Sequence, residues 1–173
     1  LVGGSISDIA FDLAYSPNGT LFFAGQFLTV AGTAGAKYLG RWANGVFGTL
    51  QGGTVSDFVT TLCFSPTGTL FAGGLFTTTA GTNSGPLAQW TGAFGTIAGG
   101  SISNVGGHAQ VQSLLWGRDQ ALYAGGTFNR AGGTLTNNIA RAKNDTWGTM
   151  QGGVQGGVNI VSVQDLAQAP NGM

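Results

Sequence analysis

Glutamate is absent from this sequence, and charged residues of any kind are scarce. Six aspartates are balanced by six lysines and arginines, so the formal net charge is zero. Proteins that bind nucleic acid or anionic membranes need a basic patch, and disordered chains combine low hydrophobicity with high net charge. This composition indicates neither class. Since no run of about 18 apolar residues occurs, we also expect no transmembrane helix and no membrane insertion.

One cysteine and one histidine narrow the possible chemistry further. Cys63 cannot form an internal disulfide, and His108 alone can build neither a histidine metal cluster nor an obvious Ser-His-Asp triad. The aspartates are scattered, without the spacing of an EF-hand loop or of a carboxylate pair for glycoside hydrolysis. We therefore predict no enzymatic activity, no cofactor and no metal site. Cys63 lies in an alternating segment, where a thiol acts as a small apolar residue.

Glycine is abundant, with 33 residues among 173, and threonine, serine, alanine and asparagine are frequent. Glycine weakens helices and threonine favours strands, while glutamate and lysine, two good helix formers, are absent or rare. The glycines do not recur every third residue, so collagen is excluded. The composition predicts an all-β domain.

A turn followed by an apolar strand recurs along the chain. The copies are 16–27, 65–76 and 117–128, and 169–172 begins a fourth, at spacings of 49, 52 and 52 residues. Asn18-Gly19 between apolar runs is a strong hairpin signal because both residues tolerate positive φ. Such repeats are informative about the fold, because repeats of 20–50 residues indicate solenoids or propellers.

Each copy contains four strand-like segments. The first alternates, with Ile9, Phe11, Leu13 and Tyr15 on one face, which we expect to lie against a core. The second has small residues at its centre, which indicate close approach of another backbone or large side chain. Two further segments follow around a short turn, and each copy ends in a glycine pair. The aromatic residues recur with the repeat, so they are predicted to pack between copies. For Trp42 and Trp90 an exposed sugar platform is the alternative.

Four short strands per repeat are typical of a β-propeller blade. The pattern Ala-Gly-Gly-x-Phe-Thr-Thr-x-Ala-Gly at 72–81, with the Trp- and Gly-containing segments after it, resembles the kelch-like propeller repeats of bacterial and phage surface proteins. Ala24-Gly25 and Ala142 depart from the pattern. The resemblance implies blades that are four-stranded antiparallel sheets. We predict one domain over 1–173, with repeats at 5–53, 54–100, 101–153 and a truncated fourth at 154–173.

Three and a third blades do not make a closed propeller, which typically has four to eight. We therefore expect a partial propeller from a larger chain, completed by missing blades or by other chains. Propeller connectivity places the tight turns on one face and the longer loops on the other. The stretch from glycine pair to turn is 12 residues in the first two copies and 17 and 16 in the next two.

Variable loops on a rigid frame are where binding tends to reside, although unconstrained drift explains such variation equally well. The candidate binding-face residues are Asn83, Ser84, Asn104, His108, Gln110, Thr136, Asn137, Gln155 and Asn159. The predicted partner is a protein or a glycan, and nucleic acid is not expected.

The functional prediction is a non-enzymatic propeller module of a secreted, cell-surface or virion-surface protein. It would act in structural scaffolding or adhesion, as a phage tail or receptor-binding component does. The alternative is a carbohydrate-active or copper-oxidase-like enzyme on a kelch-type propeller, with its site in the missing blades.

Overall fold

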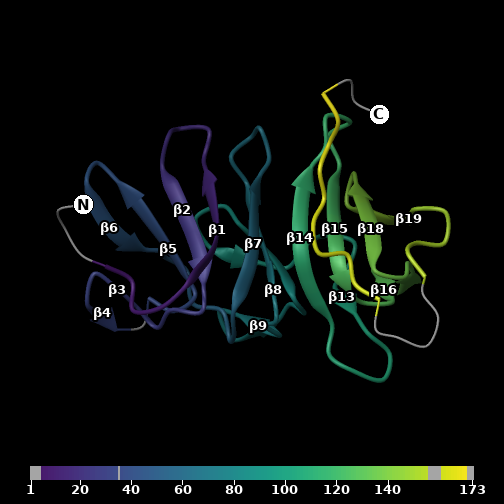
Figure 1. Cartoon of the computed structure of the whole chain (residues 1–173), viewed down its shortest axis with the longest axis horizontal. Helices are drawn as coiled ribbons and strands as arrows, with labels where there is room; N and C mark the ends of the chain where they lie inside the picture. The colour runs from purple at the N-terminus through teal and green to yellow at the C-terminus, as the bar shows by residue number, and fades with distance from the viewer. Residues whose placement is uncertain (1–4, 35, 156–160, 171–173) are drawn as a thin grey trace.

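The computed structural model describes residues 5–34, 36–155 and 161–170, and every structural statement here concerns those residues. They form strands and turns without an α-helix, which confirms the all-β prediction. No helix long and apolar enough to cross a membrane is present in this part of the chain. Three four-stranded antiparallel sheets dominate the structure (Figure 1).

Each sheet is built from one repeat, and its strands follow chain order from one edge to the other. Sheet 1 contains β1 (Ala10–Tyr15), β2 (Leu21–Gly25), β5 (Leu39–Ala43) and β6 (Val46–Thr49). Sheet 2 contains β7 (Val59–Phe64), β8 (Leu70–Gly74), β11 (Leu87–Trp90) and β12 (Phe94–Gly95). Sheet 3 contains β14 (Gln110–Trp116), β15 (Leu122–Thr127), β18 (Ile139–Lys143) and β19 (Thr146–Thr149).

In every sheet, the loop between the second and third strands contains a short two-stranded hairpin. These hairpins are β3 (Thr29–Val30) with β4 (Thr33–Ala34), β9 (Thr78–Thr79) with β10 (Thr82–Asn83), and β16 (Arg130–Ala131) with β17 (Thr134–Leu135). The residues that precede each sheet pair with these hairpins. In the third repeat they form β13 (Ile102–Ser103), and in the first two they make single bridges at Ile6 and Val55.

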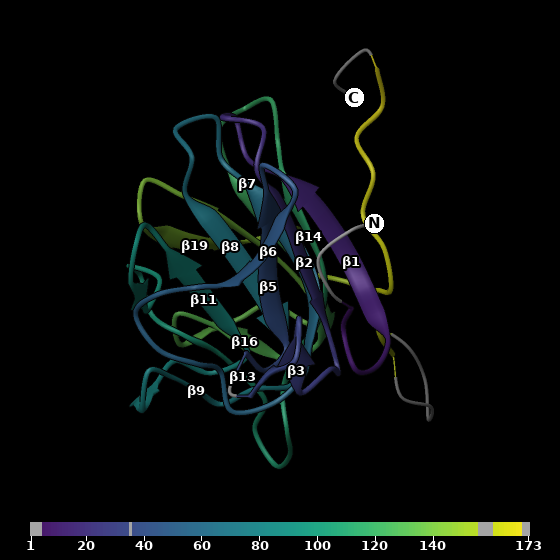
Figure 2. The same cartoon turned by 90° about the vertical axis from the view of Figure 1, so that its left-hand side faces the viewer.

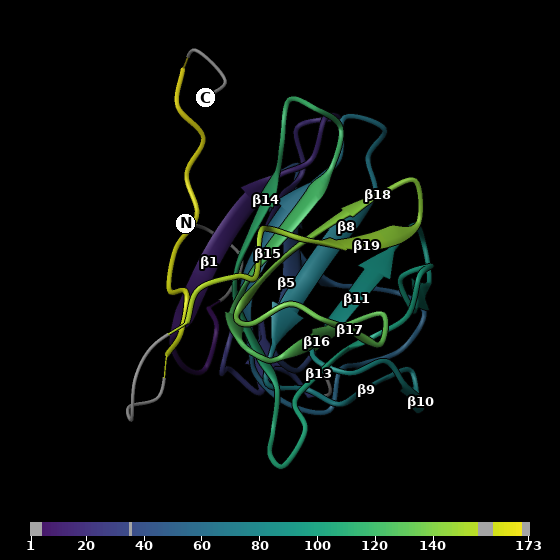
Figure 3. The ribbon, with the colours of Figure 1, turned by 90° about the vertical axis from the view of Figure 1, so that its right-hand side faces the viewer.

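The three sheets stand in a row, with the first strand of each beside the first strand of the next. β1 contacts β7, and β7 contacts β14. Sheet 1 faces the viewer in Figure 2, and sheet 3 faces the viewer in Figure 3. The sheets do not close into a ring. The four-stranded units are therefore established, whereas the propeller is still a proposal.

The glycines of the second strands have two different roles. A Cβ on Gly73 would lie 2.5 Å from Cγ1 of Val111 in the next sheet, and a Cβ on Gly125 would lie 2.6 Å from Cγ1 of Val163. The prediction of close approach at these glycines is therefore confirmed. The following glycine, such as Gly74, faces a bulge in the first strand, where the carbonyl oxygen of Phe58 leaves no room for a Cβ.

The backbone conformations of the turns agree only in part with those predicted from the sequence. Asn44 and Gly45 between β5 and β6 both have positive φ, 51° and 81°, as a tight hairpin turn requires. Between β1 and β2 only Gly19 does, at 82°. The expectation of positive φ at Asn18 is wrong. Its side chain instead accepts hydrogen bonds from the Ser16 hydroxyl and the Thr20 N–H, which close a longer loop.

The core lies between the sheets. Phe27, Phe76 and Phe128, which follow the ends of β2, β8 and β15, are almost completely buried. One apolar cluster fills the space between sheets 1 and 2, and a second fills the space between sheets 2 and 3. Across the first of these interfaces, Phe22 contacts Phe64 edge to face with ring centroids 5.2 Å apart. The recurring aromatic residues pack between repeats here, as predicted.

One expectation about the core is wrong. Ile9, Phe11, Leu13 and Tyr15, predicted to face a core, are 55, 46, 62 and 67% exposed. The alternation is that of a strand, but none of the described sheets covers the face on which these four residues lie. In sheet 2, Leu62 takes the place of Leu13 and is only 5% exposed. An alternating pattern identifies which residues share one face of a strand, but the burial of that face depends on whether another sheet packs against it.

Candidate functional site

The loops divide between two ends of the row of sheets, as expected. The turns β1–β2, β7–β8 and β14–β15 point to the top of Figure 1, and we call this the turn end. The short hairpins and the loop 104–109 lie at the bottom, which we call the loop end. The two ends offer different groups, so each is considered as a binding surface.

The predicted residues of the loop end are not equivalent. Asn83, His108 and Gln155 are exposed, and Asn104, Gln110 and Asn137 are half-buried. Ser84 and Thr136 hold equivalent positions in two repeats and are 2% and 0% exposed, so neither presents its side chain to a ligand. Asn159 lies outside the described residues. Ser84 and Thr136 directly follow the second strands of two short hairpins, β10 and β17, and both are buried.

Several amides at the loop end are already engaged with the backbone. Asn137 Nδ2 donates to the carbonyl oxygen of Gly152 at 2.9 Å, and Gln155 Nε2 donates to the same oxygen at 3.3 Å. Asn104 Nδ2 donates to the carbonyl oxygen of His108 at 3.4 Å. In the part of the chain that the structure describes, no group of histidine, cysteine and acidic residues could hold a metal. Asn83 Oδ1 accepts a hydrogen bond from the Gly85 N–H at 3.3 Å, so His108 has the freest side chain among the predicted residues of the loop end that the structure describes.

The turn end contains a hollow between sheets 1 and 2 that the sequence did not indicate. Its volume is about 310 Å³, and its walls include Phe22, Arg41, Phe64 and Trp90. The indole of Trp90 lies 5.9 Å from the Phe22 ring, centroid to centroid. Between sheets 2 and 3, Trp116 stacks on Phe71 at 5.5 Å, and the hollow there shrinks to about 90 Å³. Trp116 thus fills space that Phe64 leaves open.

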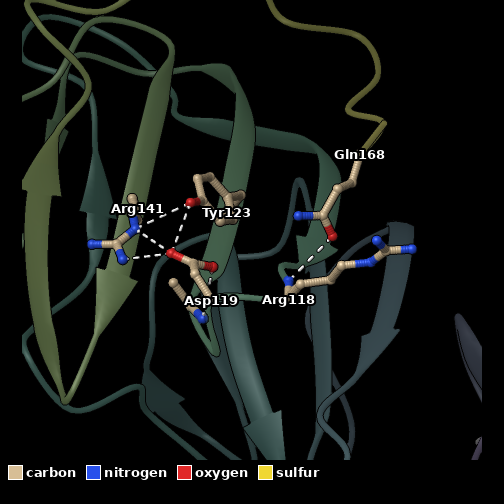
Figure 4. A network of polar contacts seen from close by, with 6 residues as sticks. Arg118, Asp119, Tyr123, Arg141 and Gln168 are labelled. Carbon is tan, nitrogen blue, oxygen red and sulfur yellow. Dashed lines mark hydrogen bonds and ion pairs between the residues drawn. The ribbon is translucent and has the colours of Figure 1, made fainter. Parts of the chain in front are cut away.

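The arginine of this hollow has a well-paired counterpart in sheet 3. Asp119 Oδ2 accepts hydrogen bonds from Arg141 Nε at 2.9 Å, from Arg141 Nη2 at 2.5 Å and from the Tyr123 hydroxyl at 3.0 Å (Figure 4). The hydrogen bonds from Arg141 are the main reason that the pKa of Asp119 is lowered. Beside this network, the N–H of Arg118 donates to Gln168 Oε1 at 3.1 Å. The network fixes the β14–β15 turn to β18.

In sheet 1 the same three positions hold Asn18, Phe22 and Arg41, since Arg41 pairs with Phe22 as Arg141 pairs with Tyr123. An amide and a phenyl ring replace the carboxylate and the phenol. The described residues provide no ion pair for Arg41. Its guanidinium is exposed at the wall of the hollow, where it can meet an anionic group.

Cys63 is enclosed within the interface between sheets. Burial, with a smaller effect from the Asp12 carboxylate, raises the pKa of its thiol to about 12. Only the thiolate is a strong nucleophile, so Cys63 is unreactive at neutral pH. Its packing against the core of sheets 2 and 3 agrees with the predicted role as a small apolar residue.

No family model matches the chain, and no curated protein matches it in sequence. Solved structures similar to it include two of the extracellular domain of BT4673 from B. thetaiotaomicron, a protein described in one case as a one-component system and in the other as a hybrid two-component system. They share 15% identity with this chain, at TM-scores of 0.57 and 0.58. The similarity covers 94 and 95% of this chain but only 19 and 20% of theirs. The chain thus shares its fold with about a fifth of an extracellular domain.

Proposed function

We propose that this chain is a non-catalytic module of an extracellular protein, acting in scaffolding or adhesion. The observation that carries the proposal is the row of three sheets whose interfaces repeat the same contacts, a rigid frame with loops at one end. The similarity of this frame to part of an extracellular domain supports the location. A propeller with kelch-like repeats is the architecture we propose for the parent protein, and a phage tail or other virion surface is a setting that fits the neutral composition.

The ligand that we propose is a glycan, and the turn end suggests where it binds. Aromatic faces and a few polar groups are the usual lining of a sugar pocket. An arginine adds bidentate recognition of a carboxylate. Phe64, Trp90 and Arg41 meet this description at the hollow between sheets 1 and 2. The loop end, with Asn83 and His108, is the proposed surface for a protein partner.

A glycan array that contains neutral and carboxylated sugars tests this assignment. We expect signal on carboxylated glycans, and its loss in Arg41→Gln but not in the matched control Lys143→Gln, which removes an exposed cation from sheet 3. Equal loss in both variants would show non-specific charge attraction. Signal abolished by Asn83→Ala with His108→Ala, and retained in Arg41→Gln, would move the site to the loop end.

The location is tested separately, with antibodies against this chain on intact source cells or particles. Labelling without permeabilisation is the expected result. Labelling only after permeabilisation would contradict an extracellular protein. If the location is correct and neither glycans nor proteins bind, scaffolding is the function that is left.

A further inference from the structure

The two interfaces between sheets repeat one hydrogen bond. The backbone N–H of Leu62 donates to Asp12 Oδ2 of the preceding sheet at 2.6 Å. The N–H of Leu114 donates to Thr61 Oγ1 at 3.1 Å. Asp12, Thr61 and, in sheet 3, Ser113 occupy equivalent positions, and each side chain presents an oxygen to the next unit.

The bond occurs a third time, at a segment beyond sheet 3. Residues 161–170 run beside β14 in Figure 1, and the N–H of Leu166 donates to Ser113 Oγ at 3.0 Å. Val163 fills the space above Gly125, as Val111 does above Gly73. One set of contacts therefore joins each unit to the next at three successive places.

Sheet 1 presents the acceptor, the carboxylate of Asp12, to sheet 2. On its other face, the equivalent donor is the N–H of Leu13, and no unit that the structure describes lies opposite it. Leu13 is equivalent to Leu62 and Leu114, yet it is 62% exposed, whereas they are 5 and 7% exposed. Within the described ranges, the N–H of Leu13 bonds only to Asp12 Oδ1 of its own strand. Leu166 makes the same local bond in addition to the bond with Ser113, so the local bond does not exclude a neighbour.

A tryptophan shows the same asymmetry. Trp90 Nε1 donates to the carbonyl oxygen of Gln51 in the preceding unit at 2.8 Å. Trp42 takes the equivalent place in sheet 1, and its Nε1 is buried without a hydrogen-bond partner among the described residues. A buried N–H without a partner costs about 1–3 kcal/mol. Because Gly3 and Gly4 correspond to Gly52 and Gly53, the place of Gln51 falls at Val2, which lies outside the described residues.

Apolar side chains surround these two donors. Leu13, Tyr15, Phe23, Trp42 and Phe47 line an open hollow of about 640 Å³ on this face. Patches of this kind on a soluble protein mark interaction sites. In the inner interfaces, the same positions are covered by the preceding sheet of the row.

We propose that this face of sheet 1 docks a further unit of the same repeat, joined in line before it in one polypeptide. The unit supplies a side-chain oxygen of Asp, Thr or Ser to the Leu13 N–H. Its sheet covers the apolar hollow as sheet 1 covers sheet 2. The proposal rests on the contacts between units and is independent of the ligand and location proposed above.

A fusion protein tests it. Residues 54–98 are placed directly before Gly3, so that Gly3 and Gly4 replace the identical pair Gly99 and Gly100 and the spacing of the repeat is kept. Amide hydrogen exchange is then measured at Leu13. We expect exchange to slow by about tenfold or more, toward the rate at Leu62, because a docked and hydrogen-bonded amide opens rarely. The Tm should rise.

The matched control is the same fusion with Thr61→Val in the added copy alone. It should keep most of the rise in Tm and lose most of the protection at Leu13. Unchanged exchange at Leu13 in the fusion, or a Tm below that of the chain by itself, would overturn the proposal. So would a concentration-dependent dimer of the unfused chain that Leu13→Asp dissociates, because the occupant would then be a second copy.

Discussion

Leu13 and Leu62 occupy the same place in two sheets of the same design, but their surroundings differ completely. Leu62 lies between sheets 1 and 2, and its backbone N–H bonds to Asp12. Leu13 has 62% of its surface exposed and no sheet beside it in the described structure. In an array of stacked units, each unit contacts only its neighbours. We therefore expect equivalent residues to stabilise the fold only where the neighbouring unit that covers them is present.

Substitution by aspartate at the two leucines gives the largest expected difference. Leu62→Asp would bury an unpaired carboxylate and should cost about 3–5 kcal/mol in the free energy of unfolding, enough to unfold a marginal domain. Leu13→Asp should change it by no more than about 0.5 kcal/mol, because the side chain is already in water. Urea unfolding followed by circular dichroism measures both. Similar losses for the two variants would mean that the β1 face is covered in solution.

The contact between sheets 2 and 3 predicts the next effect. Gly73→Ala would place a Cβ 2.5 Å from Cγ1 of Val111, so it should cost about 1–3 kcal/mol as an overpacked core does. Gly48→Ala is the control, since its Cβ would meet nothing closer than Arg41 Nε at 3.5 Å. Thermal unfolding should separate the two variants.

A double variant shows whether the contact itself is responsible. Val111→Ala makes room for the new Cβ, so adding it to Gly73→Ala should cost less than the sum of the two single losses. Additive losses would place the effect of Gly73→Ala in the strand backbone rather than at the interface between sheets.

The hydrogen bond from Leu114 to Thr61 gives a smaller effect. Thr61→Val keeps the shape of the side chain and removes the acceptor, which leaves a buried N–H unsatisfied and should cost about 1–2 kcal/mol. Thr49→Val, at an exposed position of β6, is the control and should be nearly neutral. Faster hydrogen exchange at the Leu114 amide in Thr61→Val alone would locate the loss at this bond. Unchanged exchange would show that the bond contributes nothing.

The repeated sheets could be predicted from the sequence because they depend on local signals. Alternation, turn residues and the spacing of the copies are visible in each unit by itself, and the recurring Phe27, Phe76 and Phe128 indicated a buried position that all copies share. The central glycines also indicated a close contact, and the structure identifies Val111 and Val163 as the side chains that make it.

The candidate sites could not be predicted in the same way, because they depend on contacts between units. Nothing local distinguishes Arg41 from Arg141. The difference arises from Asn18 and Asp119, which lie more than 20 residues away in each copy. Comparison of equivalent positions across the copies would have revealed it, since aspartate occurs at this turn position only once. Likewise, Ser84 and Thr136 look like loop residues, and nothing in the sequence indicates that the positions directly after the short hairpins are buried.

Substitution of Arg41 and Arg141, which are equivalent in sheets 1 and 3, gives the smallest expected effect on stability. The Asp119–Arg141 pair is about one-third exposed on both sides, so Arg141→Gln should cost at most about 1 kcal/mol at pH 7. The pKa of Asp119 is lowered in the folded state, so the stabilisation is complete above the ordinary carboxyl value of 3.8 and is lost as the pH falls through the lower, folded value. The difference in Tm between the wild type and Arg141→Gln should therefore shrink as the pH falls below 3.8. Arg41→Gln should show no such difference at any pH, because Arg41 has no ion-pair partner in the described residues. A pH-dependent loss in Arg41→Gln would contradict the claim that this guanidinium is available to a ligand.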